Sequence, residues 1–213
     1  APTISKLFHN SEHTQLIFLA KFTTRWILYF GTPILLFVVL LPSEILHLAF
    51  GKDYLTGTIP LFWLTIGQLF YITFGIADQY FLMTGHQKSW LAISFLTFIL
   101  TIVLDLFFIP RFGLVGAAIV SCAMMLLIGL LALVGIKYLL NFWIVDFQLL
   151  KPWLASIVSG VFTYLAIQHW EFSPTYHVLI TLGLSGFLFV CALLLLGIEK
   201  EDILIVKQIF HRN

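Results

Sequence analysis

The sequence predicts an all-α protein that lies in a membrane as a bundle of helices. Of its 213 residues, 61% are hydrophobic and only 10% are charged, whereas soluble domains carry roughly 25% charged residues. Long apolar stretches recur along the chain, and the connections between them are short. Because so few charges cannot cover a surface that faces water, most of the surface is expected to face lipid.

Six stretches are long enough to cross the hydrocarbon core of a bilayer, which takes about 20 apolar residues. The backbone of each stretch must satisfy its own hydrogen bonds in lipid, so each is predicted to be helical. Short links favour neighbouring helices that alternate in direction. The predicted spans are residues 26–46, 59–83, 90–109, 114–134, 153–168 and 178–197. The third and fourth are separated by the tight turn Pro110-Arg111-Phe112-Gly113, where proline ends a helix and glycine permits a sharp reversal.

The spans divide the chain into three regions. Residues 1–25 are predicted to be a cytoplasmic connector, residues 26–139 a core of four transmembrane helices, and residues 140–213 two additional helices with a cytoplasmic tail. The chain begins Ala1-Pro2, without an initiator Met or a signal peptide, so we expect a piece of a longer protein.

One short motif in the connector invites a catalytic interpretation. His9, Glu12 and His13 match H-x-x-E-H, the inverted zinc-peptidase signature. Two histidines at this spacing can ligate zinc with the glutamate as base. However, only some twenty loop residues surround the motif, whereas the catalytic fold would be a soluble domain. We therefore interpret these residues as part of a solvated connector and expect no metal and no cofactor.

The basic residues give the predicted orientation, because cytoplasmic loops of membrane proteins are rich in Lys and Arg. Nine of the eleven basic residues lie on one side of the predicted bundle, and two, Lys52 and Arg111, lie on the other. The nine-residue side is predicted to be cytoplasmic, which places both ends of the chain there. The nine are Lys6, Lys21, Arg25, Lys88, Lys137, Lys151, Lys200, Lys207 and Arg212.

A polar stripe runs along the third predicted span. Ser94, Thr97, Thr101 and Asp105 fall within one sector of roughly 80° at 100° per residue. An Asp in lipid costs on the order of 2.5–3.5 kcal/mol at a helix centre and less near an end. The stripe is therefore expected to face protein or water. For Asp105 itself two interpretations stay open: it bonds a neighbouring hydroxyl or Arg111 near the outer interface, or it lines a polar pathway.

The second predicted span carries a similar stripe, which ends at a second intramembrane acid. Asp78 lies roughly 9 Å from the cytoplasmic end at 1.5 Å per residue. An ionisable side chain at that depth is a functional candidate by default, and a hydrogen-bonded packing role is the alternative. The stripe, which spans about 140°, consists of Thr65, Gln68, Tyr71, Gly75, Asp78 and Gln79.

Small residues and the two cysteines indicate packing. Gly113, Gly116, Ala117 and Ser121 have the spacing that lets helix backbones approach closely, and Ser156, Gly160 and Thr163 do the same on the fifth span. Cys122 and Cys191 both lie in apolar runs, so we expect inert packing residues instead of a disulfide or a metal site.

Three motifs, taken in order, resemble the C-terminal half of bacterial polysaccharide biosynthesis proteins. These are the Wzx-type oligosaccharide flippases of the multidrug/oligosaccharidyl-lipid/polysaccharide exporter superfamily. The resemblance covers residues 1 to about 151, and the last two spans match only as extra C-terminal helices. The motifs are Phe50-Gly51-x-x-Tyr54, then Thr84-Gly85 with Lys88, then Ile109-Pro110-x-x-Gly113-x-x-Gly116-Ala117-Ala118.

The resemblance implies part of a two-lobe fold that resembles multidrug exporters, with an N-terminal lobe missing here. It implies a transporter, not an enzyme, which moves undecaprenyl-diphosphate-linked oligosaccharide across the bacterial inner membrane by alternating access. Expected partners are this lipid-linked substrate, membrane lipids and the missing lobe, with no nucleic acid. Coupling to protons or sodium is an open expectation. The cavity-lining or coupling candidates are Thr65, Gln68, Asp78, Gln79, Thr97, Thr101 and Asp105.

The chain departs from the family at two points, and three other functions are the alternatives. Family members often carry Asn where this chain has Asp105, and no cationic residue here clearly corresponds to those expected to hold the diphosphate. A drug exporter of the same superfamily would share the helical plan. A glycan polymerase would be expected to have larger outer loops bearing Arg, His or acids, and a purely structural subunit is opposed by the polar stripes.

Overall fold

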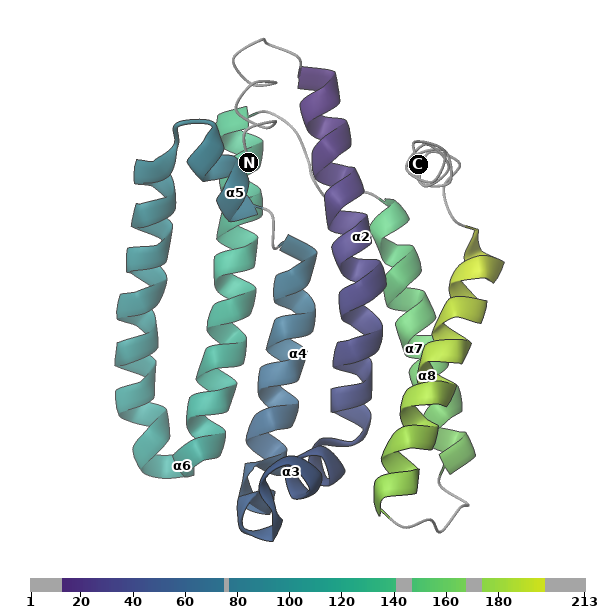
Figure 1. Ribbon diagram of the computed structural model, residues 1–213. Coiled ribbons are helices and arrows are strands. Elements are labelled where there is room, and N and C mark those ends of the chain that lie inside the picture. The colour runs from purple at the N-terminus through teal and green to yellow at the C-terminus, as the bar shows by residue number, and fades with distance from the viewer. Residues whose placement is uncertain (1–12, 75–76, 141–146, 168–173, 198–213) are drawn as a thin grey trace.

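The computed structural model describes residues 13–74, 77–140, 147–167 and 174–197. These residues are almost entirely helical, and none of them forms a strand. The helices run up and down in turn (Figure 1). The predicted class, an all-α bundle of membrane helices, is confirmed.

Helix α2 (His13–Leu40) lies in the middle of the bundle. It contacts α4 (Thr58–Phe74) on one side and the pair α7 (Leu150–Ile167) and α8 (Pro174–Leu196) on the other. The far side of α4 packs against α6 (Gln87–Leu140). Figure 1 shows the resulting order, from α6 through α4 and α2 to the α7–α8 pair.

The first helix begins earlier and ends earlier than predicted. The sequence predicted a helix over residues 26–46, but α2 starts at His13 and stops at Leu40. Leu41 leaves the helical conformation, with φ −130° and ψ 49°, and Pro42 starts the separate helix α3 (Pro42–Phe50). Proline suits a first helical position because it lacks the N–H that would have no partner there. Part of the predicted connector is thus helical and continuous with the first span.

The second predicted span, residues 59–83, is described as two helices. A 3₁₀ turn, η1 (Lys52–Gly57), leads into α4, and α5 (Ala77–Met83) follows. Residues 75–76 lie outside the described part of the chain. The continuous polar face from Thr65 to Gln79, which includes Gly75, therefore stays a prediction.

The third and fourth predicted spans form the hairpin α6. A straight helix of its 53 span-forming residues would be about 80 Å long, more than twice the thickness of the hydrocarbon core. The chain instead reverses at Gly113, whose φ of 57° and ψ of −136° are not helical, as Figure 1 shows. The predicted turn is confirmed, although the first helix of the hairpin continues past Pro110 instead of ending at Ile109. Glycine is required there because a side chain disfavours this conformation.

Helices α7 and α8 lie within a few residues of the last two predicted spans. A short 3₁₀ turn, η2 (Phe147–Leu149), precedes α7. Among the described residues, four helical segments are long and apolar enough to cross a membrane, and one of them is the α6 hairpin. Helix α7 is not among the four, so the count of six spans stays a prediction, as does the division into three regions.

The main core lies where α2, α5 and the second half of α6 meet. Leu16 and Ala20 of α2, which fall within the predicted connector, are almost completely buried in it. The Tyr80 hydroxyl donates a hydrogen bond of 3.3 Å to the Leu16 carbonyl, which ties α5 to α2. The other core residues are Ala77, Phe81, Ala132, Leu133 and Ile136.

Close packing between α4 and α6 depends on Gly67. A Cβ atom at Gly67 would lie 2.9 Å from Cys122 Cα and 3.0 Å from Met125 Sδ. Cys122 is a buried free cysteine that fills the space opposite this glycine. By contrast, a Cβ at Gly183 of α8 would meet no described atom within 4 Å.

We predict that Gly67→Ala lowers the thermal stability of the complete protein in detergent, whereas Gly183→Ala does not. Ala favours a helix by up to about 1 kcal/mol over Gly, and Gly183→Ala should keep that gain. At Gly67 overpacking against the backbone of α6 should cost roughly 1–3 kcal/mol. Equal melting temperatures for the two variants would contradict the α4–α6 contact described here.

Candidate functional site

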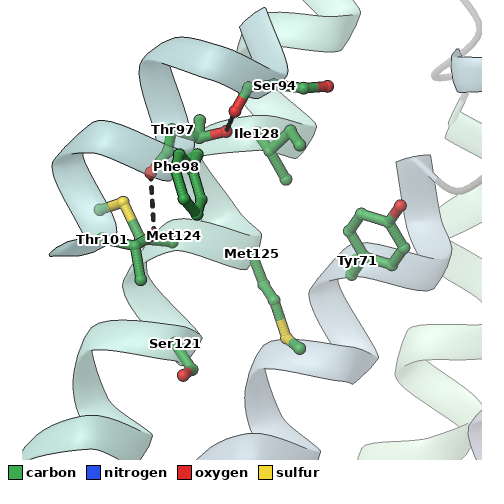
Figure 2. A pocket seen from close by; sticks show the side chains of 9 residues that line it. All are labelled: Tyr71, Ser94, Thr97, Phe98, Thr101, Ser121, Met124, Met125 and Ile128. Atoms are coloured by element: carbon green, nitrogen blue, oxygen red, sulfur yellow. Dashed lines mark hydrogen bonds between the residues drawn. The ribbon is translucent and has the colours of Figure 1, made fainter.

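A groove of about 330 Å³ opens between α4 and the two halves of α6. Helix α4 contributes Tyr71, while the rest of the lining comes from the hairpin (Figure 2). Most of the polar stripe predicted on the third span faces this groove, which is therefore walled by protein. The lining residues are Tyr71, Ser94, Thr97, Phe98, Thr101, Ser121, Met124, Met125 and Ile128.

The hydroxyl groups of the groove differ in their hydrogen bonding. Thr97 is buried, and its Oγ1 donates to two carbonyls of its own helix, those of Ile93 and Ser94, each at 3.0 Å. Thr101 Oγ1 donates to the Thr97 carbonyl at 2.8 Å. Ser94, Ser121 and Tyr71 make no side-chain hydrogen bond to the described residues, so their hydroxyls are available to water or a ligand.

The α4 candidates Thr65 and Gln68 do not line this groove. Thr65 is buried, and its hydroxyl donates to the Leu61 carbonyl at 2.7 Å, which satisfies it within α4. Gln68 is half-buried. The hydroxyl of Thr65 is thus already hydrogen-bonded. A transport role for Thr65 or Gln68 stays a prediction.

Asp78 lies in the first turn of α5, at the end of the bundle opposite the α6 reversal (Figure 1). Its Oδ1 accepts a 2.7 Å hydrogen bond from the backbone N–H of Gln79, whose side chain is exposed. A carboxylate is well placed at a helix N-terminus because backbone N–H groups point towards it.

Asp105 lies apart from the groove and from Asp78. It is in the first half of α6, eight residues or about 12 Å before the reversal at Gly113. Its Oδ1 is buried without a hydrogen-bond partner among the described residues, so a bond to Arg111 or a nearby hydroxyl is not made by that oxygen. It borders a second groove of about 310 Å³, whose other lining residues are Ile102, Leu106, Ile109 and Pro110.

Two features of the site were missed in the sequence. Ser121, Met124, Met125 and Ile128 recur at the spacing of one helix face, a signal that could have identified the α6 wall of the groove. Arg25, assigned to the connector, is only 2% exposed, and its Nη1 donates to Gln148 Oε1 beside α7. That contact joins residues 123 positions apart, so no local sequence pattern could predict it.

No metal centre is formed by the described residues, since no three of their His, Cys, Asp or Glu side chains come together. The H-x-x-E-H motif falls on residues 9–13. Of these only His13, the first residue of α2, belongs to the described part of the chain.

Apolar helices that alternate in direction define the class of protein: a multi-pass membrane protein, here with a groove whose polar groups are uncharged. No protein-family profile matches the sequence, and no curated protein matches it. The chain is, however, similar in fold to a solved structure of the lipid II flippase MurJ in its inward closed conformation.

The likeness to MurJ has a TM-score of 0.72 and 17% sequence identity. It covers 89% of this chain but only 40% of that chain, so the present residues correspond to less than half of the flippase. At this identity the match establishes the fold: the chain has the fold of part of a lipid flippase.

Proposed function

We propose that this chain is part of a transporter that flips a lipid-linked glycan across the bacterial inner membrane. The fold shared with part of a lipid II flippase is the observation that carries this proposal. The three sequence motifs that resemble Wzx-type proteins favour an undecaprenyl-diphosphate-linked oligosaccharide as the substrate. The function is therefore transport without covalent chemistry, and alternating access requires a second lobe to move against this one.

The proposal predicts flipping by the complete protein that contains these residues. In vesicles with a fluorescent or radiolabelled lipid-linked oligosaccharide, the complete protein should carry label across the bilayer. Residues 1–213 alone should not, because one lobe offers no opposing surface to rock against. Translocation by the fragment, or none by the complete protein, would refute the two-lobe transport mechanism.

We also propose that the ends of the chain are cytoplasmic. Of the seven basic residues in the described part, five lie in the first half of α2, in the first and last turns of α6 or in the first turn of α7. These five are Lys21, Arg25, Lys88, Lys137 and Lys151; Lys52 and Arg111 lie towards the other end. The first turn of α2 and the last turn of α8 are at the five-residue end (Figure 1). The positive-inside bias supports the cytoplasm for that side.

This orientation predicts the labelling pattern of two exposed positions. After Cys122 and Cys191 are changed to Ser, Asp53→Cys should react with an impermeant thiol reagent from the periplasm. Gln87→Cys should react only after the cells are opened, because it begins α6 at the cytoplasmic end. The reverse pattern would invert the proposed topology.

Asp78 is the residue that we propose for coupling transport to protons or another cation. It is half-buried in the first turn of α5, and a carboxylate there can exchange a proton or contact a cation. Asp105 is the natural comparison, since it is an acid of the same bundle that borders the second groove.

Asp78→Asn in the complete protein should lower the flipping rate by about tenfold or more, which corresponds to a rise of roughly 1.4 kcal/mol in the barrier. Asp105→Asn should change the rate little, because Asn keeps the shape and hydrogen-bonding capacity and the resembling family often carries it. Rates measured in vesicles across a range of pH should lose their pH dependence only in Asp78→Asn. If that variant transports normally with an unchanged pH profile, Asp78 is a packing residue.

A further inference from the structure

Helix α7 is fastened to α4, although α2 lies between these two helices in the bundle (Figure 1). The indole N–H of Trp153, near the start of α7, donates a hydrogen bond of 3.2 Å to Thr73 Oγ1 near the end of α4. The Trp153 ring also lies against the Phe70 ring, with 5.1 Å between the ring centroids. One side chain of α7 thus contacts two residues of α4 that are three positions apart.

The hydrogen bond to Thr73 is shielded from water, because Thr73 is only 8% exposed. The Thr73 hydroxyl also donates to the Leu69 carbonyl at 3.3 Å, so its oxygen bonds α4 and α7 at once. An indole N–H can only donate, and a donor that loses its partner away from water is costly. A sliding motion of α7 along α4 would break this bond.

Two further contacts hold α7 to α2. The buried Arg25 donates through its Nη1 to Gln148 Oε1, just before α7 begins. Gly160 lets α7 approach α2 closely, since a Cβ atom there would lie 2.8 Å from Leu36 Cδ1. Gly160 lies about 10 Å beyond Trp153 along the helix axis. Because the contacts are spread along α7, the helix cannot pivot about any one of them.

Helix α8 is held to α7 at two levels. Ala155 of α7 packs with Phe189 and Ala192 of α8 in a second buried cluster. Closer to the end of α8, Lys151 Nζ donates a hydrogen bond of 3.0 Å to the Gly197 carbonyl. A displacement of α8 would therefore carry α7 with it.

We propose that α7 and α8 are a fixed part of this lobe, which moves as one body with α2 and α4 during transport. Trp153 is the positioning residue that sets α7 against α4. The inference rests on the proposed function. It opposes the alternative that two helices which match the resembling family only as C-terminal extras form an accessory pair that swings against the core. Alternating access needs hinge or sliding motion at some interface, and the proposal excludes the interface between α2 and α7.

A reversible cross-link between α2 and α7 tests the proposal in the complete protein, after Cys122 and Cys191 are changed to Ser. Leu36→Cys with Gly160→Cys should form a disulfide on oxidation, because the side chain at position 36 already lies against position 160. Labelled undecaprenyl diphosphate carrying one N-acetylhexosamine should be flipped at the same rate by the oxidised and the reduced protein. A rate that falls on oxidation and recovers with reductant would overturn the proposal, as would failure of the disulfide to form.

A distance measurement tests the role of Trp153 in the same cysteine-free background. Spin labels on Ile59→Cys of α4 and Leu195→Cys of α8, at positions 56% and 89% exposed, should report one narrow distance, with or without the same lipid. Trp153→Ala should broaden this distance. If that variant does not fold, Thr73→Val, which removes the acceptor, takes its place.

The matched control is Trp63→Ala, because Trp63 is an exposed tryptophan of α4 whose ring contacts Phe62 of its own helix. This variant should keep the narrow distance. Two distances in the protein that keeps Trp153, or equal distributions for the Trp63 and Trp153 variants, would overturn the proposal. A protein that shows one narrow distance but flips no lipid would instead overturn the proposed function.

Discussion

The absence of water in the hydrocarbon core is the constraint on which the rest of this structure depends. Backbone groups must pair within each helix, and polar side chains must find partners there too. Thr24, Thr32 and Thr65 meet this demand in the same way, by donating to carbonyls four residues earlier, at 2.9, 2.6 and 2.7 Å. Such bonds hide a hydroxyl inside its own helix, so a threonine in a span does not by itself mark a site.

A few polar groups escape this arrangement, and they gather beside the two grooves. Ser94, Ser121 and Tyr71 open into one groove without hydrogen bonds to the described residues, and one oxygen of Asp105 is unpartnered beside the other groove. In lipid these groups would be costly. Water or a ligand in these grooves would satisfy them.

Comparison of the predicted and observed helices shows where local patterns suffice. The reversal at residues 110–113 was predictable because proline and glycine act on their own backbone, and Gly113 adopts the positive φ that the turn needs. The start of the first helix was not, because Leu16 and Ala20 are buried by residues of α5 and α6 more than fifty positions away. Lys21 and Arg25 made that stretch resemble a solvated connector, yet Arg25 is buried against Gln148.

The sequence by itself determined that the chain is an all-helical membrane bundle, that its spans alternate, and that Thr97 and Thr101 share a face. It did so because composition and a period of 3.6 residues are properties of single segments. Only the tertiary structure decided that Ser121 and Met125 complete the groove, and that Asp105 borders a different one. The rotation of each helix about its axis is set by contacts between segments, such as Gly67 against Cys122, and no single segment contains that information.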